Sequence, residues 1–174
     1  MTGRLRIGFA AALILAHALI VSSGVLAGNS FDHAAPSIET LIDQFLSALA
    51  AKDRAALHQL RVTESEYLET ILPGTVAVGA EQRKWPEEVT KFYWAQMNDK
   101  SSFYEGFLLQ KFGGRKYRFK SVKYEKGTQQ YATYSAFKQM RLALEDGDGT
   151  PIELATGSIA EVDGQYKFIS FIRD

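Results

Sequence analysis

The hydrophobic pattern of this chain changes its period once, close to Gly114. Over residues 38–112, apolar side chains recur every three or four positions, which is the spacing of one face of an α-helix. From Tyr117 and Phe119 onward, apolar and polar residues alternate, as they do along a half-buried strand. Helices that precede a run of strands are typical of an α+β domain, and we expect that fold class here.

The helical half carries clear start and stop signals. Ser37 and Asp53 are suitable N-cap residues, and Thr63 with Glu66 matches a capping box. The polar stretch 98–102 is expected to interrupt the last helical segment, because it breaks the apolar stripe. The expected helices cover residues 37–51, 53–60, 63–73, 86–97 and 102–112.

The strand half is expected to form a curved, four-stranded antiparallel meander on which the helices pack. A shift of the apolar phase near Lys120-Ser121 predicts a β-bulge, and Asp163-Gly164 predicts a tight hairpin turn. The pattern leaves open whether residues 74–85 form another hairpin. The expected strands cover residues 116–124, 130–144, 152–162 and 165–172.

The N-terminus has the order of an export signal. Arg4 and Arg6 precede an apolar run over residues 7–21, and small residues before the end at Ala27 suit a signal peptidase. The alternative is an uncleaved anchor helix over residues 7–28, which is long enough to span a bilayer. The chain then divides into a signal peptide at 1–27, a polar tether at 28–36 and one domain at 37–174.

Composition limits what the exported domain can be. The chain has no cysteine, so core packing must hold the domain together, and an N-terminal lipid-modified cysteine is excluded. Its 20 basic and 20 acidic residues balance, and loss of Arg4 and Arg6 leaves the domain slightly acidic. We therefore expect a periplasmic or secreted protein with no nucleic-acid partner, in contact with a membrane only if residues 7–28 stay uncleaved.

Two stretches of the chain resemble a known superfamily. Residues 45–57, FLSALAAKDRAAL, are similar to the junction of the first two helices of NTF2-like domains, and residues 157–168, GSIAEVDGQYKF, are similar to their closing hairpin. This superfamily includes ketosteroid isomerase-like and polyketide cyclase-like proteins. The resemblance implies a cone over residues 37–174, in which helices cross the concave side of the sheet and the open end holds a small ligand.

The residues predict no catalytic group, no metal and no cofactor. Asp43 is expected on the solvent side of its helix, and Glu66 in a cap. The lone His58 has no second ligand at metal-binding spacing. The acidic stretch 145–149 lacks the remaining ligands of a calcium loop, and we interpret it as a hairpin turn.

Basic and aromatic residues are interleaved between positions 111 and 126. Such a pattern can bind single-stranded nucleic acid, but export argues against that partner. A solvated strand face is the simpler interpretation, and an anionic lipid or cell-wall polymer is the alternative ligand. The basic residues are Lys111, Arg115, Lys116, Arg118, Lys120, Lys123 and Lys126, and the aromatic ones are Tyr117, Phe119 and Tyr124.

A ligand pocket in the cone would be lined by Tyr67, Trp85, Tyr93, Tyr134 and Lys138. Tyrosine and tryptophan offer apolar area with a polar tip, which suits a small hydrophobic ligand, although packing in the core would also explain them. Lys138 shares an apolar face of its long strand. It therefore needs either a bulge or edge that opens a route to water, or an anionic ligand.

Both faces of the last strand carry apolar residues, with Phe168 on one face and Phe171 on the other. A sheet with two apolar faces needs a second cover, so we expect a homodimer formed through the convex face.

The function expected from these patterns is a non-catalytic module that binds a small ligand or an envelope protein. The first alternative is an enzyme that applies acid–base chemistry to a small hydrophobic substrate, and the second is an envelope-assembly protein. A deep cavity with an unpaired carboxylate or histidine would favour the enzyme. A cone filled by aromatic side chains would favour the module, and an exposed apolar patch the assembly protein.

Overall fold

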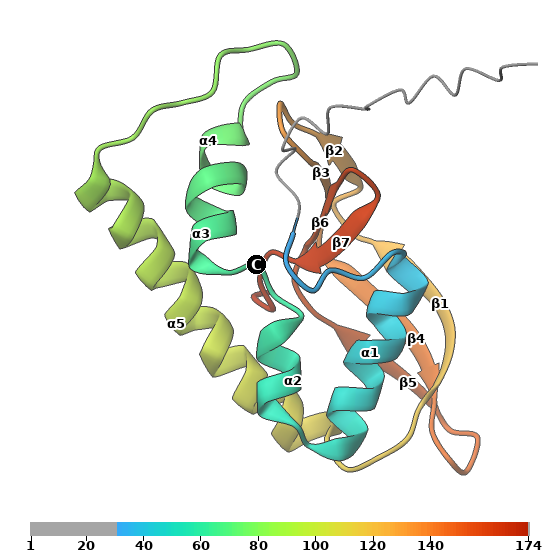
Figure 1. Cartoon of the computed structure of the whole chain (residues 1–174). Helices are drawn as coiled ribbons and strands as arrows, with labels where there is room; N and C mark the ends of the chain where they lie inside the picture. Colours follow the sequence, from blue (N-terminus) through green and yellow to red (C-terminus); the bar gives the residue numbers. More distant parts are fainter. Residues whose placement is uncertain (1–30, 174) are drawn as a thin grey trace, which may run out of the picture.

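The computed structural model describes residues 31–173, in which helices occupy the first half of the chain and strands the second (Figure 1). This order confirms the α+β class. The predicted signal peptide, residues 1–27, lies outside the described residues. In the part of the chain that is described, no helix combines the length and the apolar character needed to cross a membrane.

The helices begin at the residues that their caps predict. The side chains of Ser37 and Asp53 each accept a hydrogen bond from a backbone N–H of the first turn. Thr63 and Glu66 form the predicted capping box. The helices are α1 (Ile38–Ala51), α2 (Arg54–Gln59), α3 (Glu64–Glu66), the π-helical turn η1 (Tyr67–Ile71), α4 (Leu72–Gly74) and α5 (Glu87–Phe112).

The interruption expected at residues 98–102 is wrong, because α5 runs through it without a break. Its polar side chains have partners elsewhere in the fold. Asn98 accepts a hydrogen bond from Arg61, and the buried Ser101 hydroxyl contacts the sulfur of Met97. Residues 98–102 therefore stay helical because of these tertiary contacts, although their local sequence pattern disfavours a helix. Residues 75–86 form the connection to α5 and contain no strand.

The strands form two antiparallel sheets rather than one meander. One sheet has the order β1-β4-β5 and the other β2-β3-β6-β7. The predicted bulge in β1 is confirmed by a register shift between Phe119 and Ser121. The predicted tight turn is also present, and both Asp163 and Gly164 have positive φ, as a type I′ turn requires. The strands are β1 (Arg118–Tyr124), β2 (Thr128–Gln130), β3 (Ser135–Phe137), β4 (Met140–Glu145), β5 (Pro151–Ala155), β6 (Ile159–Val162) and β7 (Gln165–Phe168).

Two opposing breaks separate the sheets. The strand expected over 130–144 begins only at Ser135, because residues 131–134 join β2 to its partner β3. It also breaks at Gln139, which has a φ of 58°, and the strand expected over 152–162 breaks around Gly157. A Cβ atom on Gly157 would lie 2.0 Å from the carbonyl oxygen of Ser170, so only glycine fits this crossing. The expected four-stranded sheet is therefore a ribbon kinked where the C-terminal segment passes over it.

The main core fills the space between α1 and the strands. Phe45 from α1 packs on Phe168 and Phe171, with ring centroids 5.3 and 5.7 Å away, and those two rings are 4.8 Å apart. All three side chains are fully buried. Aromatic side chains thus occupy the interior in which a cone would hold its ligand.

A second core covers the other face of the β2-β3-β6-β7 sheet. Its strand residues are Ala136 of β3 and Ala160 and Val162 of β6. Val62, before α3, and Ile71, the last residue of η1, pack against them. The sheet's second apolar face is therefore covered by this chain itself. The apolar character of this face therefore does not require a second copy of the chain to cover it.

The part of the predicted tether that the structure describes, residues 31–36, belongs to the domain. Phe31 is only 4% exposed within the second core. Ala35 forms an antiparallel bridge with Tyr166, with N···O distances of 3.1 and 2.9 Å in the two directions. The domain therefore begins at or before residue 31 rather than at residue 37.

Candidate functional site

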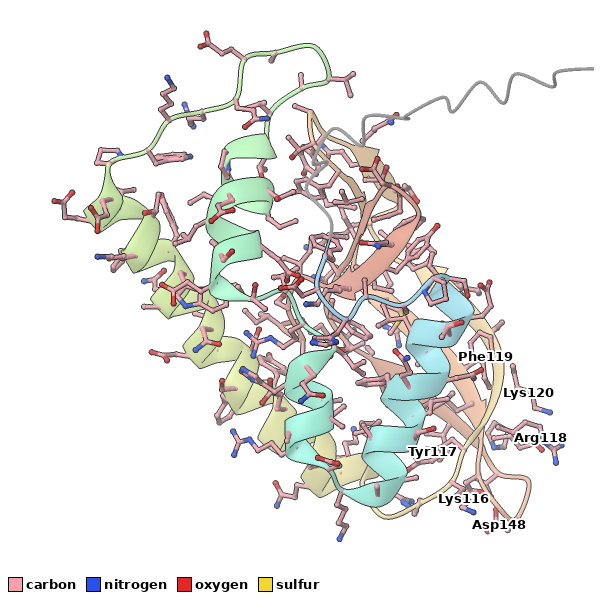
Figure 2. The ribbon with its side chains drawn as sticks, in the orientation of Figure 1. Lys116, Tyr117, Arg118, Phe119, Lys120 and Asp148 are labelled. Carbon is pink, nitrogen blue, oxygen red and sulfur yellow. The ribbon has the colours of Figure 1, made fainter. Side chains whose placement is uncertain are left out.

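A surface hollow of about 720 Å³ lies between α1 and the start of β1. Figure 2 shows Tyr117 and Phe119 beside α1, with Lys116 near the lower end of that helix. The helix contributes residues spaced three and four apart, which therefore share one face. We call this hollow the α1–β1 groove, and its lining residues are Asp43, Leu46, Ser47, Ala50, Ala51, Lys116, Tyr117 and Phe119.

Contacts at both ends of α1 set the direction of the groove. At the C-terminal end of α1, the N–H of Gly114 donates to the carbonyl of Leu49 at 3.0 Å. At the other end, Tyr124 lies near Glu39; burial and, to a smaller extent, the Glu39 charge raise the pKa of Tyr124 to about 12. The chain after α5 thus runs antiparallel to α1. Lys116 is consequently at the helix C-terminal end of the groove, away from Asp43.

The hydroxyl oxygen of Tyr117 is buried and has no hydrogen-bond partner among the described residues. Its ring meets Phe112 edge-on at 6.4 Å, and the guanidinium of Arg115 lies 5.7 Å from the ring centroid. Burial is the main cause that raises the pKa of Tyr117; Asp146 adds to the rise and Arg115 opposes it. The phenol therefore stays protonated near neutral pH and has an unused O–H donor beside the groove.

The cations of the basic stretch differ in how they are paired. Arg118 and Lys120 both bind Glu145, at 2.9 and 2.7 Å. Lys116 is exposed and forms no ion pair within the described part of the chain. Lys116 is therefore the lysine of the groove whose charge is available to a ligand.

A second hollow, of about 480 Å³, adjoins the groove because Lys116 and Tyr117 line both. Its far wall is the turn between β4 and β5, where Asp146 and Asp148 accept hydrogen bonds from the N–H of Thr150. These turn contacts confirm the hairpin interpretation of residues 145–149. Among the described residues, no group of three potential metal ligands occurs here or elsewhere.

Three of the five residues predicted to line a pocket lie near one another, because Tyr67 interacts with both Tyr93 and Tyr134. Tyr67 packs against Trp94 at 5.6 Å, and Trp85 against Tyr93 at 5.7 Å. Tyr134 belongs to the second core, against which Tyr67 packs; it hydrogen-bonds the Thr75 hydroxyl at 2.9 Å and lines, with Lys138, a small hollow of about 190 Å³. Packing between aromatic side chains accounts for most of these positions.

The structure explains Lys138 by the strand break. The residue stands between β3 and β4, and its ammonium donates to the side-chain oxygen of the exposed Gln129 at 3.0 Å. The sequence offered a bulge or edge with a route to water as one of two explanations, and the break at Gln139 supplies such a route; the anionic ligand stays a prediction.

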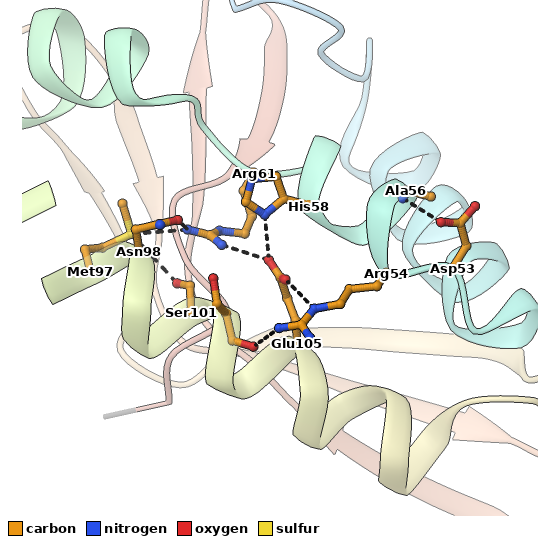
Figure 3. A network of polar contacts seen from close by, with 10 residues as sticks. Asp53, Arg54, Ala56, His58, Arg61, Met97, Asn98, Ser101 and Glu105 are labelled. Atoms are coloured by element: carbon orange, nitrogen blue, oxygen red, sulfur yellow. Dashed lines mark hydrogen bonds and ion pairs between the residues drawn. The ribbon is translucent and has the colours of Figure 1, made fainter. Parts of the chain in front are cut away.

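Two buried ion pairs escaped the sequence interpretation. Figure 3 shows the first, in which Arg61, 2% exposed, donates to Glu105, 1% exposed, at 2.8 Å. His58 and Arg54 approach the same carboxylate at 3.3 and 3.6 Å. This network joins α2, and Arg61 two residues beyond its end, to α5.

The second buried pair joins Lys167 of β7 to Glu66 of α3, with Nζ 2.9 Å from Oε2. Glu66 thus has a partner in addition to its capping role. The sequence signal for both pairs was a single cation between apolar neighbours, at Arg61 and at Lys167. A lone cation in the sequence does not indicate which acidic residue pairs with it. Because both buried carboxylates are matched by cations, neither is the unpaired acid that would indicate catalysis.

Comparisons with protein-family models, with curated proteins and with solved structures find no match. The NTF2-like resemblance and the functions that it implies therefore stay predictions.

Proposed function

We propose that the protein is an exported, non-catalytic module that binds an anionic amphiphile, such as a fatty acid or an anionic lipid, in the α1–β1 groove. The observation that carries the proposal is the unpartnered Tyr117 hydroxyl next to the unpaired Lys116. An acceptor that carries negative charge would pair with Lys116, and it would also accept the Tyr117 O–H if that side chain turned toward the groove; charge-assisted hydrogen bonds are stronger than neutral ones.

The rest of the groove suits an acyl chain. Leu46, Ala50 and Phe119 give it apolar walls, and Ala50 and Ala51 leave room next to the helix backbone. Asp43 lies toward the opposite end from Lys116 and disfavours a second negative charge there, whereas at the Lys116 end the lysine charge opposes that of Asp146, which acts on Tyr117. The ligand would therefore lie with its anionic group at Lys116 and Tyr117 and its apolar part along α1.

Two features support a module over an enzyme. The interior between α1 and the strands is filled by Phe45, Phe168 and Phe171. The buried carboxylates of Glu66 and Glu105 are held in ion pairs. A kinked antiparallel ribbon with a helix across one face is also what an NTF2-like cone would require, and we retain that family as part of the proposal.

Isothermal titration calorimetry with decanoate tests the proposal. We expect saturable binding that Lys116→Glu weakens about tenfold, since one charge contact near a surface supplies about 1.4 kcal/mol or more. Lys123→Glu is the matched control, because Lys123 is exposed on β1, the strand that follows Lys116, and lies outside the groove. Decyltrimethylammonium has the same chain with a positive head and should bind much less. Equal effects of the two substitutions, or equal binding of the two amphiphiles, would reject the proposal.

A further inference from the structure

The outward face of α5 presents phenylalanine rings to solvent. Phe92, Phe103 and Phe107 are 57%, 74% and 44% exposed. At 100° per residue, their positions fall within about 60° of one another around the helix axis. The opposite face of α5 is buried, and its buried residues are Ser101, Glu105, Leu108 and Phe112. The exposed rings therefore form one stripe, which we call the α5 stripe.

The stripe is not needed by the core of this domain. Figure 1 shows α5 along one edge of the molecule, with α2, α3 and α4 on its inner side. Among the aromatic rings that the structure describes, Phe92 contacts only its neighbour Tyr93, and Phe103 contacts Tyr104. Large apolar side chains aligned on the solvent face of a helix are characteristic of a contact surface.

Residues on this face of α5 are arranged so that each half of the helix complements the other half. Taken from the point between Asp99 and Lys100, Phe92 stands as far before it as Phe107 stands after it. Glu88 and Lys111 are likewise equidistant from that point and opposite in charge. Asp99 and Lys100 form no ion pair within the described part of the chain.

We propose that two copies of this chain associate through α5, antiparallel, about a two-fold axis that passes between Asp99 and Lys100. Phe92 of each copy then packs on Phe107 of the other. Asp99 of each faces Lys100 of the other, and Glu88 faces Lys111. Antiparallel helices also oppose their macrodipoles.

The charges select this arrangement over a parallel one. In a parallel pair in register, Asp99 would face Asp99 and Lys100 would face Lys100, and like charges in contact are unfavourable. The antiparallel register pairs Phe92 with Phe107 and both sets of charges with their complements, and it places Phe103 opposite Gln96. The charge pattern of the stripe therefore favours a second copy of this chain as the partner.

The expected affinity is modest. At about 200 Å² for each phenylalanine ring, the three exposed fractions amount to roughly 350 Å² of apolar surface per copy. This is less than half of the surface that each partner of a standard interface buries. The dimer should consequently dissociate on dilution rather than persist as an obligate assembly.

Sedimentation velocity over a range of protein concentrations tests the proposal. The wild-type protein should shift from monomer to dimer as concentration rises, and Phe103→Glu should remain monomeric. Val78→Glu is the matched control: Val78 is 64% exposed in the connection before α5, so the change of charge is the same and the dimer should persist. A monomer at every concentration, or equal loss of dimer in both variants, overturns the proposal.

Charge reversal tests the register. Asp99→Lys alone and Lys100→Asp alone each place like charges opposite one another, so each should weaken dimerisation by about fivefold or more. The double variant, Asp99→Lys with Lys100→Asp, restores opposite charges across the same axis and should recover the wild-type dimer. No recovery in the double variant contradicts the antiparallel two-fold arrangement.

Binding of a persistent monomer to lipid vesicles through Phe103 would also overturn the proposal, because the stripe would then serve a membrane surface.

Discussion

Lys167 and Glu66 form an ion pair in the interior, although Lys167 is only 2% exposed and Glu66 only 7%. The same ammonium donates to the carbonyl of Asp32 at 2.9 Å, and the carboxylate accepts N–H bonds from Asp32 and Thr63. One pair thus holds the N-terminal segment, α3 and β7 together.

Loss of this lysine should be costly. Lys167→Met would leave the Glu66 carboxylate buried without its cation, which typically lowers the free energy of unfolding by about 3–5 kcal/mol. Arg118→Met is the control, because Arg118 is exposed and its pair with Glu145 should contribute less than about 1 kcal/mol. Urea unfolding measures both, and a similar loss in the two variants would show that burial does not decide the effect.

Tyr117→Phe should separate stability from binding. The phenol oxygen is buried without a partner, so its removal relieves a desolvation cost and should leave the free energy of unfolding unchanged or raise it by about 1 kcal/mol. Affinity for decanoate should fall, since the ligand loses its O–H donor. Thermal unfolding and calorimetry on the same samples measure the two quantities. An unchanged affinity would remove Tyr117 from the site.

Gly157→Ala should distort the kink between the sheets. The new Cβ would meet the Ser170 carbonyl at 2.0 Å, and backbone must move to relieve the clash, at a cost of about 1–3 kcal/mol or more. Gly147 has open space around its Cβ position, so Gly147→Ala serves as the control and should be nearly neutral. Chemical unfolding measures both. Equal stability of the two variants would mean that Ser170 does not approach Gly157 in solution.

The buried phenol of Tyr134 should make stability depend on alkaline pH. Burial raises the pKa of Tyr134 to about 12, while its hydrogen bond with Thr75 acts in the opposite direction. The unfolded chain has a tyrosine pKa of about 10, so the folded state holds this proton more tightly. Its contribution is complete below about pH 10 and is lost as pH rises toward 12, at up to roughly 1.4 kcal/mol per pH unit.

Tyr134→Phe removes that titration. Between pH 10 and 12 the variant's free energy of unfolding should fall less steeply than that of the wild type. Between pH 7 and 9 the two curves should stay parallel. Urea unfolding at each pH supplies the slopes, and parallel curves up to pH 12 would contradict the assignment.

Local signals predicted the elements that depend on local contacts. Ser37, Asp53 and the Thr63–Glu66 box mark helix starts because a cap hydrogen-bonds its own first turn. The Asp163-Gly164 turn is equally local. These features could be placed from the sequence to within a residue or two.

Features that depend on distant residues could not be predicted in the same way. The break at Gly157 exists because Ser170 crosses there, and α5 continues through residue 98 because Arg61 supplies a partner. The α1–β1 groove likewise needs the chain after α5 to return beside α1. The sequence identified the basic stretch around Lys116, but it could not show which lysine would remain unpaired.

The most direct test of the binding account is a two-dimensional ¹H–¹⁵N NMR titration of the protein with decanoate. The account predicts saturable shifts confined to the α1–β1 groove, with the largest at Lys116 and Tyr117 and smaller ones at Leu46, Ala50 and Phe119. In Lys116→Glu the same shifts should need about tenfold more decanoate. Shifts centred on any other surface, or no saturable shifts at all, would contradict the claim that this groove is the ligand site.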